Sequence, residues 1–143
     1  MVIAFCGHSE IYDIFELEVR VLGLLRNFAD GHSVEMLIGG YGDFDDLAYR
    51  CGKRLRDDGG AVSLIYITPY LNMAERRAGY DVTLYPEIED KPPKFAIVYR
   101  NRWMVDKADL VIAYVNYRRG GAYKTYAYAK RKGKTVINFG ELC

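Results

Sequence analysis

Glycines and carboxylates gather in one short stretch of the chain, Gly39-Gly40-Tyr41-Gly42-Asp43-Phe44-Asp45. An apolar run precedes it, and apolar residues at helical spacing follow it, so the glycines are expected on a strand-to-helix turn. Glycine tolerates positive φ and lets a ligand approach the backbone without meeting a Cβ. The free N–H groups and the positive dipole end of the following helix suit a phosphate. The stretch therefore predicts an anion site.

A second stretch of the same kind, Gly120-Gly121-Ala122-Tyr123-Lys124-Thr125, follows the apolar run 111–115. Two glycine turns of this kind in one small domain predict a nucleotide pocket. Neither turn carries the dinucleotide fingerprint G-x-G-x-x-G or the Walker pattern G-x-x-x-x-G-K-[ST], which argues against a classical dehydrogenase or kinase.

Strands and helices must alternate along the chain to position these turns. Apolar runs predict strands over 2–6, 34–38, 61–68, 109–115 and 135–139, with a short edge strand over 82–85. Amphipathic patterns predict helices over 14–28, 43–57, 93–107 and 121–132. Because the strands are apolar rather than alternating, we expect an α/β fold with a Rossmann-like open, mainly parallel sheet and helices on both faces. Residues 1–143 are expected to form a single domain.

In such a sheet, ligands bind beyond the carboxyl ends of the strands, where the strand order reverses. The phosphate is expected on one or both glycine turns with Lys124 as a mobile counter-charge, and a base would stack on a nearby tyrosine. The tyrosines at the mouth are Tyr41, Tyr70, Tyr117 and Tyr123. The expected ligand-binding residues are Gly7, His8, Gly39, Gly40, Gly42, Asp45, Pro69, Tyr70, Arg100, Asn116, Gly120, Gly121, Lys124 and Thr125.

The polar residues at this edge also have structural interpretations. His8 is expected to be a hydrogen-bonding or structural histidine at the pocket floor, because no cluster of metal ligands accompanies it. Asp43 and Asp45 suit either helix capping or a functional role. A carboxylate beside a phosphate makes sense only if it faces ribose hydroxyls or a metal, or acts as a base. We expect no metal and no cofactor.

Composition narrows the partner and the compartment. The net charge of +1 gives no global reason for attraction to nucleic acid or membranes. No apolar run approaches the roughly 20 residues that span a bilayer. Cys6, Cys51 and Cys143 have no paired spacing, which predicts a reducing cytoplasm. The stretch 110–140 nevertheless lacks acids and carries Arg118, Arg119, Lys124, Lys130, Arg131, Lys132 and Lys134. We expect a small-molecule partner rather than nucleic acid.

The predicted helix 93–107 has apolar residues on every side, which one sheet cannot cover. A strip of Tyr99 and Trp103 would form an interaction patch, so we expect a homodimer through this helix. Alternatively, the irregular segment 70–92 covers the strip within one chain. Arg100 or Arg102 is expected at a ligand phosphate or at the subunit boundary, unless it only extends from the helix edge to solvent.

Several segments together resemble the SLOG superfamily, the Rossmann-like group that unites the DNA-processing protein DprA/SMF with the LOG proteins. The match looks closest to the YpsA-like branch of bacteria and phages, whose function is unknown. The segments are Phe5-Cys6-Gly7-His8, the two glycine turns, Thr68-Pro69-Tyr70-Leu71-Asn72, Pro92-Pro93-Lys94-Phe95-Ala96-Ile97 and Arg100-Asn101-Arg102-Trp103-Met104-Val105-Asp106.

LOG enzymes cleave the N-glycosidic bond of nucleoside 5′-monophosphates, and this chain matches their motifs only in part. Arg100, Met104 and Ala108-Asp109 match the first motif. The second lacks its proline, has Tyr123 in place of its third glycine, and has 126–128 where the catalytic glutamate would stand. The resemblance therefore implies a phosphate-binding role for Arg100, but it does not imply the LOG mechanism.

Three functions follow in order of preference. The first is a nucleotide or nucleotide-derivative binding domain that acts as a sensor or accessory protein. The second is a nucleotide N-glycosidase or phosphoribohydrolase-like hydrolase, in which Asp43 or Asp45 faces the ribose. The third is a nucleic-acid binding module, suggested by the DNA-processing relatives and by the acid-free basic stretch. Near-neutral charge and the lack of a base-reading motif count against it.

Overall fold

A six-stranded sheet organises the computed structural model, which describes residues 1–73 and 77–142. The strands are all parallel and lie in the order β4-β3-β2-β1-β5-β6. They are β1 (Val2–Gly7), β2 (Val34–Ile38), β3 (Val62–Ile67), β4 (Val82–Leu84), β5 (Leu110–Tyr114) and β6 (Thr135–Asn138). The helices are α1 (Ile14–Ala29), α2 (Asp43–Asp57), α3 (Ala96–Lys107) and α4 (Gly120–Arg131), and 3₁₀ turns cover Leu71–Met73 and Pro93–Phe95.

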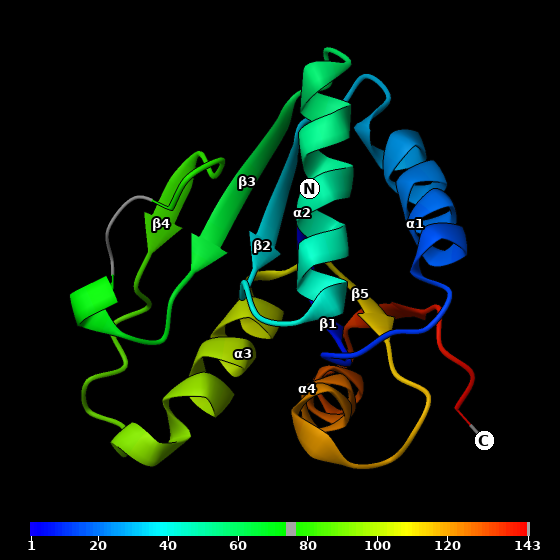
Figure 1. Cartoon of the computed structure of the whole chain (residues 1–143). Helices are drawn as coiled ribbons and strands as arrows, with labels where there is room; N and C mark the ends of the chain where they lie inside the picture. The colour runs from blue at the N-terminus through cyan, green and yellow to red at the C-terminus, as the bar shows by residue number, and fades with distance from the viewer. Residues whose placement is uncertain (74–76, 143) are drawn as a thin grey trace.

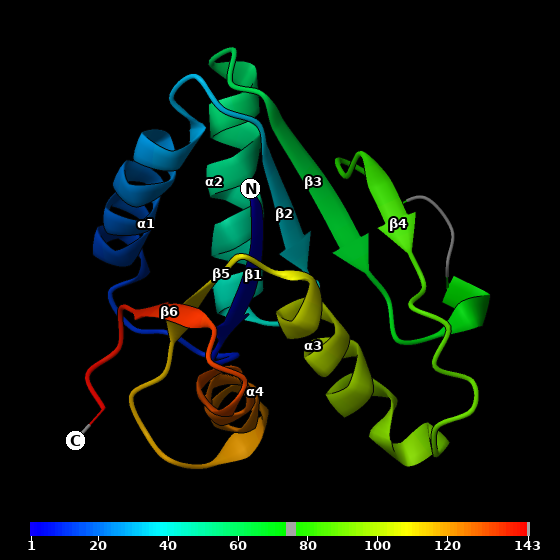
Figure 2. The ribbon, with the colours of Figure 1, turned by 180° about the vertical axis from the view of Figure 1, so that it is seen from behind.

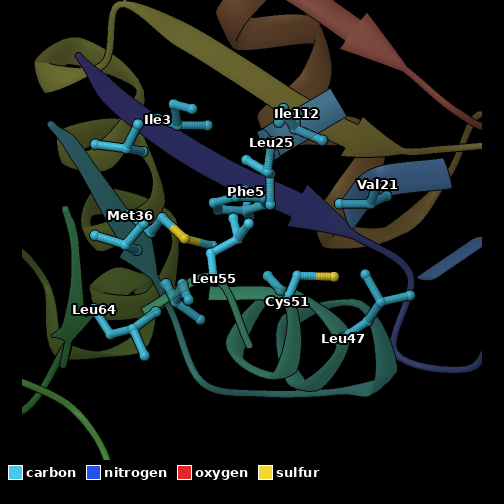
Figure 3. Close-up of a cluster of buried hydrophobic side chains, with 14 of the residues drawn as sticks. Ile3, Phe5, Val21, Leu25, Met36, Leu47, Cys51, Leu55, Leu64 and Ile112 are labelled. Carbon is cyan, nitrogen blue, oxygen red and sulfur yellow. The ribbon is translucent and has the colours of Figure 1, made fainter. Parts of the chain in front are cut away.

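The helices form a layer on each face of the sheet, as the apolar strands predict. Helices α1 and α2 lie on the face turned to the viewer in Figure 1, and α3 and α4 lie on the face seen in Figure 2. Figure 3 shows the core under α1 and α2, where Val21 and Leu25 meet Phe5 and Ile112 of the sheet. The core on the other face contains Met104 and Val105 of α3. The predicted α/β Rossmann-like fold is confirmed.

The strand order reverses at β1, the central strand. From β1 the chain moves outward through β2, β3 and β4, and then crosses back so that β5 pairs with the other side of β1. The carboxyl ends of β1 and β5 lie side by side, with Gly7 opposite Tyr114. The crevice expected at such a switch point therefore lies beside the carboxyl end of β1.

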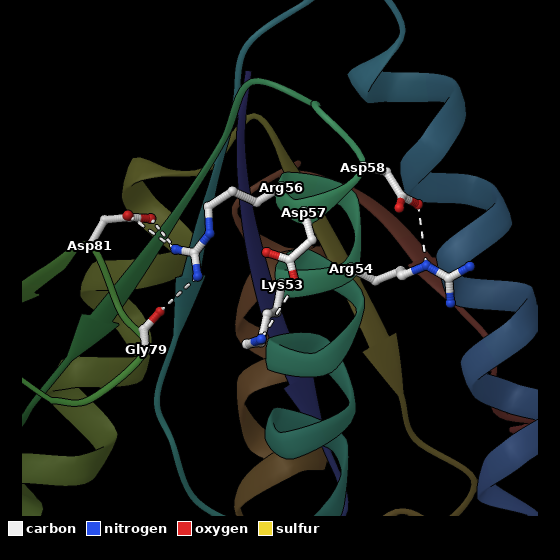
Figure 4. Close-up of polar contacts among 7 residues, drawn as sticks. All are labelled: Lys53, Arg54, Arg56, Asp57, Asp58, Gly79 and Asp81. Atoms are coloured by element: carbon white, nitrogen blue, oxygen red, sulfur yellow. Dashed lines mark hydrogen bonds and ion pairs between the residues drawn. The ribbon is translucent and has the colours of Figure 1, made fainter.

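Ion pairs at the carboxyl end of α2 hold the β4 segment in place (Figure 4). The Arg56 guanidinium donates to both oxygens of Asp81, at 3.1 and 3.0 Å, and to the Gly79 carbonyl at 3.3 Å. Asp81 in turn accepts a bond from the Leu64 N–H at 2.7 Å. One carboxylate therefore joins β3, the start of β4 and α2, which fixes the outer edge of the sheet.

The strip expected on helix 93–107 is largely covered. Tyr99 and Trp103 are half-buried, with the Lys91 ammonium 5.3 Å from the Tyr99 ring centroid and the Lys107 ammonium 5.7 Å from that of Trp103. The large apolar side chains left exposed on this segment are Phe95 and Ile97. Dimerisation through this helix stays a prediction.

No helix in the part of the chain that the structure describes is both long and apolar enough to cross a membrane.

Two helical glycines allow a matched test of the packing. A Cβ on Gly52 of α2 would lie 2.7 Å from the Met36 sulfur, whereas one on Gly23 of α1 would meet no atom within 4 Å. Gly52→Ala should therefore lower the free energy of unfolding by about 1–3 kcal/mol through overpacking. Gly23→Ala should raise it by about 0.5–1 kcal/mol, because alanine is the better helix former. Urea unfolding in dilute solution measures both, and equal effects would contradict this account of the α2–sheet packing.

Candidate functional site

A cavity of about 320 Å³ lies at the predicted crevice, between the ends of β1 and β2 and the start of α4. Eight of the predicted residues line it: Gly7, His8, Gly39, Asp45, Arg100, Gly120, Gly121 and Thr125. Two of the tyrosines expected to stack on a base, Tyr41 and Tyr117, line it as well. Seven further residues line it that were not predicted as ligand-binding residues, namely Phe5, Cys6, Ser9, Ile97, Asn101, Arg119 and Ala122. Residues from both ends of the chain thus meet in one cavity.

The second glycine turn is open to this cavity. Gly120 has a φ of 85°, which favours glycine, and a Cβ on either Gly120 or Gly121 would meet no atom within 4 Å. Arg119 stands at the N-cap without a side-chain capping bond, and the first turn of α4 contains no acid. The first backbone N–H groups of a helix have no partner inside the helix. Here they lie at the cavity wall beside a cation, which suits an anion.

The first glycine turn is closed by the protein itself. A Cβ on Gly39 would lie 3.0 Å from Cζ of Arg100, and one on Gly42 would lie 2.7 Å from Cα of Ser9. Gly40 packs against the rings and guanidinium of Tyr66 and Arg77. Gly40 and Gly42 therefore do not line the cavity, and their positive φ values of 74° and 92° serve the turn. The α2 N-terminus also carries three acids, Asp43, Asp45 and Asp46, which disfavour a second anion.

Arg100 provides a buried cation at the cavity. Its side chain is 5% exposed, and Nη1 donates to the Gly39 carbonyl at 3.0 Å and to the Ile67 carbonyl at 2.9 Å. Nε donates to Oδ1 of Asn101 at 2.8 Å. Among the residues that the structure describes, none accepts a bond from Nη2 and no carboxylate forms an ion pair with Arg100. Burial lowers the pKa of Arg100 and the charge of Asp45 opposes that change, so the cation persists at neutral pH.

The two candidate carboxylates have different surroundings. Oδ2 of Asp43 accepts a bond from the Ile11 N–H at 2.9 Å, and the Asp43 N–H donates to the Ser9 carbonyl at 2.9 Å. Asp43 therefore joins two loops and does not line the cavity. Asp45 does line it, and its Oδ2 accepts a bond from the Tyr41 N–H at 3.1 Å. Burial raises the pKa of Asp45 to about 6.

His8 holds the loop that leads into α4. The histidine is 4% exposed, and its Nε2 accepts a bond from the Asn116 N–H at 3.1 Å. The His8 ring stacks on the Tyr117 ring, with 3.7 Å between the two centroids. The Arg119 guanidinium lies 4.6 Å from the centroid of the same Tyr117 ring. Burial lowers the pKa of His8, and Arg119 lowers it further, so the imidazole is neutral and can accept. Asn116, predicted at the ligand, contacts His8 through its backbone instead.

Three further predicted residues lie elsewhere. Pro69 and Tyr70 line a groove of about 570 Å³ beside the start of α3. Lys124 lines a groove of about 320 Å³ between α3 and α4, together with Arg102 and Tyr128. Arg119 was not among the predicted ligand-binding residues, although its position directly before Gly120 and Gly121 could have indicated a cation at this turn. In residues 1–73 and 77–142, no three His, Cys, Asp or Glu side chains are grouped to hold a metal.

Solved structures share this fold. The match to the structural-genomics X-ray structure TM1055 has a TM-score of 0.65 at 20% identity and covers 95% of this chain and 72% of that one. DprA from Helicobacter pylori, from a study of its single-stranded DNA binding, matches with a TM-score of 0.67 at 17% identity. The match covers 96% of this chain and 64% of the H. pylori chain. DprA from Streptococcus pneumoniae matches with a TM-score of 0.67 at 20% identity, and the match covers 95% of this chain and 49% of the S. pneumoniae chain. The chain spans less than two thirds of either DprA chain.

These likenesses show a shared fold, which is consistent with the resemblance to the SLOG superfamily. A scan against protein-family models finds no match, and neither does a search of curated proteins. The YpsA-like branch stays a prediction.

The expectation that nucleic acid is not a partner is wrong. It rested on the near-neutral net charge and on the lack of a base-reading motif, yet DprA has this fold and the H. pylori protein binds single-stranded DNA. Net charge sums the whole surface and says little about a local basic region such as 110–140, where no acid occurs.

The raised pKa of Asp45 predicts a pH-dependent stability. Between its ordinary value of 3.8 and about 6, the folded chain holds the proton more tightly than the unfolded chain does. The free energy of unfolding therefore falls as pH rises through this range, and the loss persists above it. Asp45→Asn should remove the penalty, which raises stability at pH ~7.5 by roughly 1–3 kcal/mol and leaves it unchanged near pH ~4.

Urea unfolding at both pH values measures this effect. The control, Asp46→Asn, removes an exposed acid from the same helical turn and should lower stability slightly at neutral pH. A stability gain of Asp45→Asn that does not depend on pH would show that the carboxyl is not desolvated.

Proposed function

We propose that this chain binds a nucleotide or nucleotide derivative whose phosphate lies on the N-terminus of α4. The carrying observation is the open Gly120-Gly121 turn, whose uncapped helix faces the same cavity as the buried Arg100. Nη2 of Arg100 has no partner among the described residues, so a phosphate oxygen would complete its bonding. Arg119 adds a second cation at the rim.

The other cavity residues suit the remainder of a nucleotide. Asp45 lies in the same cavity as the phosphate site, so its carboxylate can accept bonds from ribose hydroxyls. Tyr41 is 78% exposed, lines the cavity and offers a ring face for a base. The Tyr117 ring also lines the cavity, but His8 and Arg119 already cover its faces. Such a domain would act as a sensor or accessory protein. Its placement in the cytoplasm and in the YpsA-like branch belongs to the same proposal.

Gly121→Asp tests the phosphate position. The substitution has room, and an acid in the first turn favours the helix, so the variant should fold at least as stably as the wild type. Its carboxylate would repel a phosphate, so affinity for nucleoside 5′-monophosphates and diphosphates should fall by about tenfold or more, which is ~1.4 kcal/mol. Gly121→Ala is the control and should bind normally. Calorimetric titration measures the affinities.

Two results would contradict the proposal. If no nucleotide in a broad panel binds the wild type, the function is wrong. If the Asp variant binds as tightly as the Ala variant, the phosphate lies elsewhere.

The same mixtures analysed by chromatography for free base test the alternative, an N-glycosidase that relies on Asp45. Base release that persists unchanged in Asp45→Asn would remove Asp45 from that mechanism.

Single-stranded nucleic acid is a second candidate, favoured by the groove between α3 and α4. Arg102, Lys124 and Arg131 line it with Tyr123 and Tyr128, and no carboxylate does. Cations interleaved with aromatic rings are typical of single-strand binding surfaces. The groove adjoins the cavity, because Gly121 and Thr125 line both. The fold shared with the DNA-binding H. pylori DprA points the same way.

Fluorescence anisotropy with a labelled single strand decides this candidate. Binding should weaken with salt, with a logarithmic slope of about −0.7 for each phosphate contact. Lys124→Glu should weaken binding and reduce that slope, whereas Lys53→Glu on the other face of the sheet should not. An anisotropy that stays flat at low salt would eliminate the candidate and leave the mononucleotide proposal standing.

A further inference from the structure

The outer side of α1 exposes large apolar side chains. Phe15 is 83% exposed and Val19 71%, and Tyr12, two residues before the helix, is 87% exposed. Phe15 and Val19 are four residues apart and therefore lie on one side of the helix, opposite Val21 and Leu25, which point into the core in Figure 3. Figure 1 shows α1 at the margin of the molecule, with no other element over its outer side. Apolar patches of this kind mark interaction surfaces.

A glycine interrupts the same side of the helix. Gly23 is exposed, and a Cβ there would meet nothing within 4 Å. Glycine destabilises a helix relative to alanine, and nothing among the described residues requires the missing methyl group. A glycine on an exposed apolar surface permits the close approach of another side chain. Here that side chain must come from another molecule.

The charges on α1 select the orientation of that molecule. Asp13 precedes the helix and Glu16 lies in its first turn, whereas Arg26 lies in its last turn. If two copies of α1 pack antiparallel, the acidic end of each helix lies beside the basic end of the other. The two helix dipoles then point in opposite directions, which is the favourable arrangement. A parallel pair would bring like charges together. The surface is thus self-complementary, as a two-fold interface requires.

We propose that two copies of this chain pair through α1, antiparallel, about a two-fold axis at Val19. Phe15 and Gly23 are each four residues from Val19, so Phe15 reaches the level of Gly23 of the partner subunit and fills the space above it. Arg26 lies seven residues after Val19, level with the partner's segment just before α1, where Asp13 offers an acid to the guanidinium. Arg26 can keep its 3.1 Å ion pair with Asp58. Helix α1 contributes no residue to the cavity, so both cavities stay open.

Light scattering and sedimentation equilibrium on the 143-residue chain test the pairing. The wild type should be a dimer. Val19→Glu places two carboxylates against each other at the axis and should give a folded monomer, checked by circular dichroism. The control is Ile97→Glu on α3, 50% exposed, which should remain dimeric. Gly23→Ala should weaken dimerisation by about tenfold or more, although it strengthens the isolated helix.

Three outcomes would overturn the proposal. A wild type that stays monomeric at high concentration excludes the pairing. A dimer that survives Val19→Glu but not Ile97→Glu assigns the interface to α3. A Gly23→Ala variant that dimerises as tightly as the wild type shows that the glycine is not a contact.

Discussion

The candidate site depends on the buried guanidinium of Arg100. From α3, Nη1 spans the carbonyl ends of β2 and β3, at Gly39 and Ile67, and so fixes the helix against the sheet at the point where the cavity opens. This contact explains why residue 39 is glycine, since a Cβ there would lie 3.0 Å from Cζ of Arg100. A buried cation without an ion pair is stable only when hydrogen bonds replace its lost hydration. The residues that the structure describes supply acceptors to Nε and Nη1 and none to Nη2.

The two glycine turns look alike in sequence and differ in what surrounds them. At the first, side chains of the protein fill the space that the glycines leave, and three acids in the first turn of α2 satisfy its positive end. At the second, the space is empty and the helix has neither a cap nor an acid. The cavity lining therefore combines one acid, Asp45, with two cations, Arg100 and Arg119.

Local pattern predicted the elements, but long-range contacts decided the site. Apolar runs predicted every strand, because a parallel sheet covered by helices on both faces leaves few polar positions in its strands. The pattern could not separate Asp43 from Asp45, since their roles depend on which one turns toward Ile11 in a different loop. Pro69 follows a strand and Lys124 lies near the start of a helix as expected, yet each lines a groove other than the cavity. Only the fold places Arg119 above the Tyr117 ring that His8 supports.

The contact of His8 with Asn116 joins residues 108 positions apart in the chain. The unit β1-α1-β2-α2-β3 consists of consecutive elements, whereas β5 must return to β1 across most of the chain. Closing so long a loop is entropically slow and is favoured only once the intervening elements have folded. The N-terminal half can therefore become compact first, while the cavity has no wall on the β5 side. A ligand bound as proposed would therefore need the completed cavity and would stabilise only the fully folded chain.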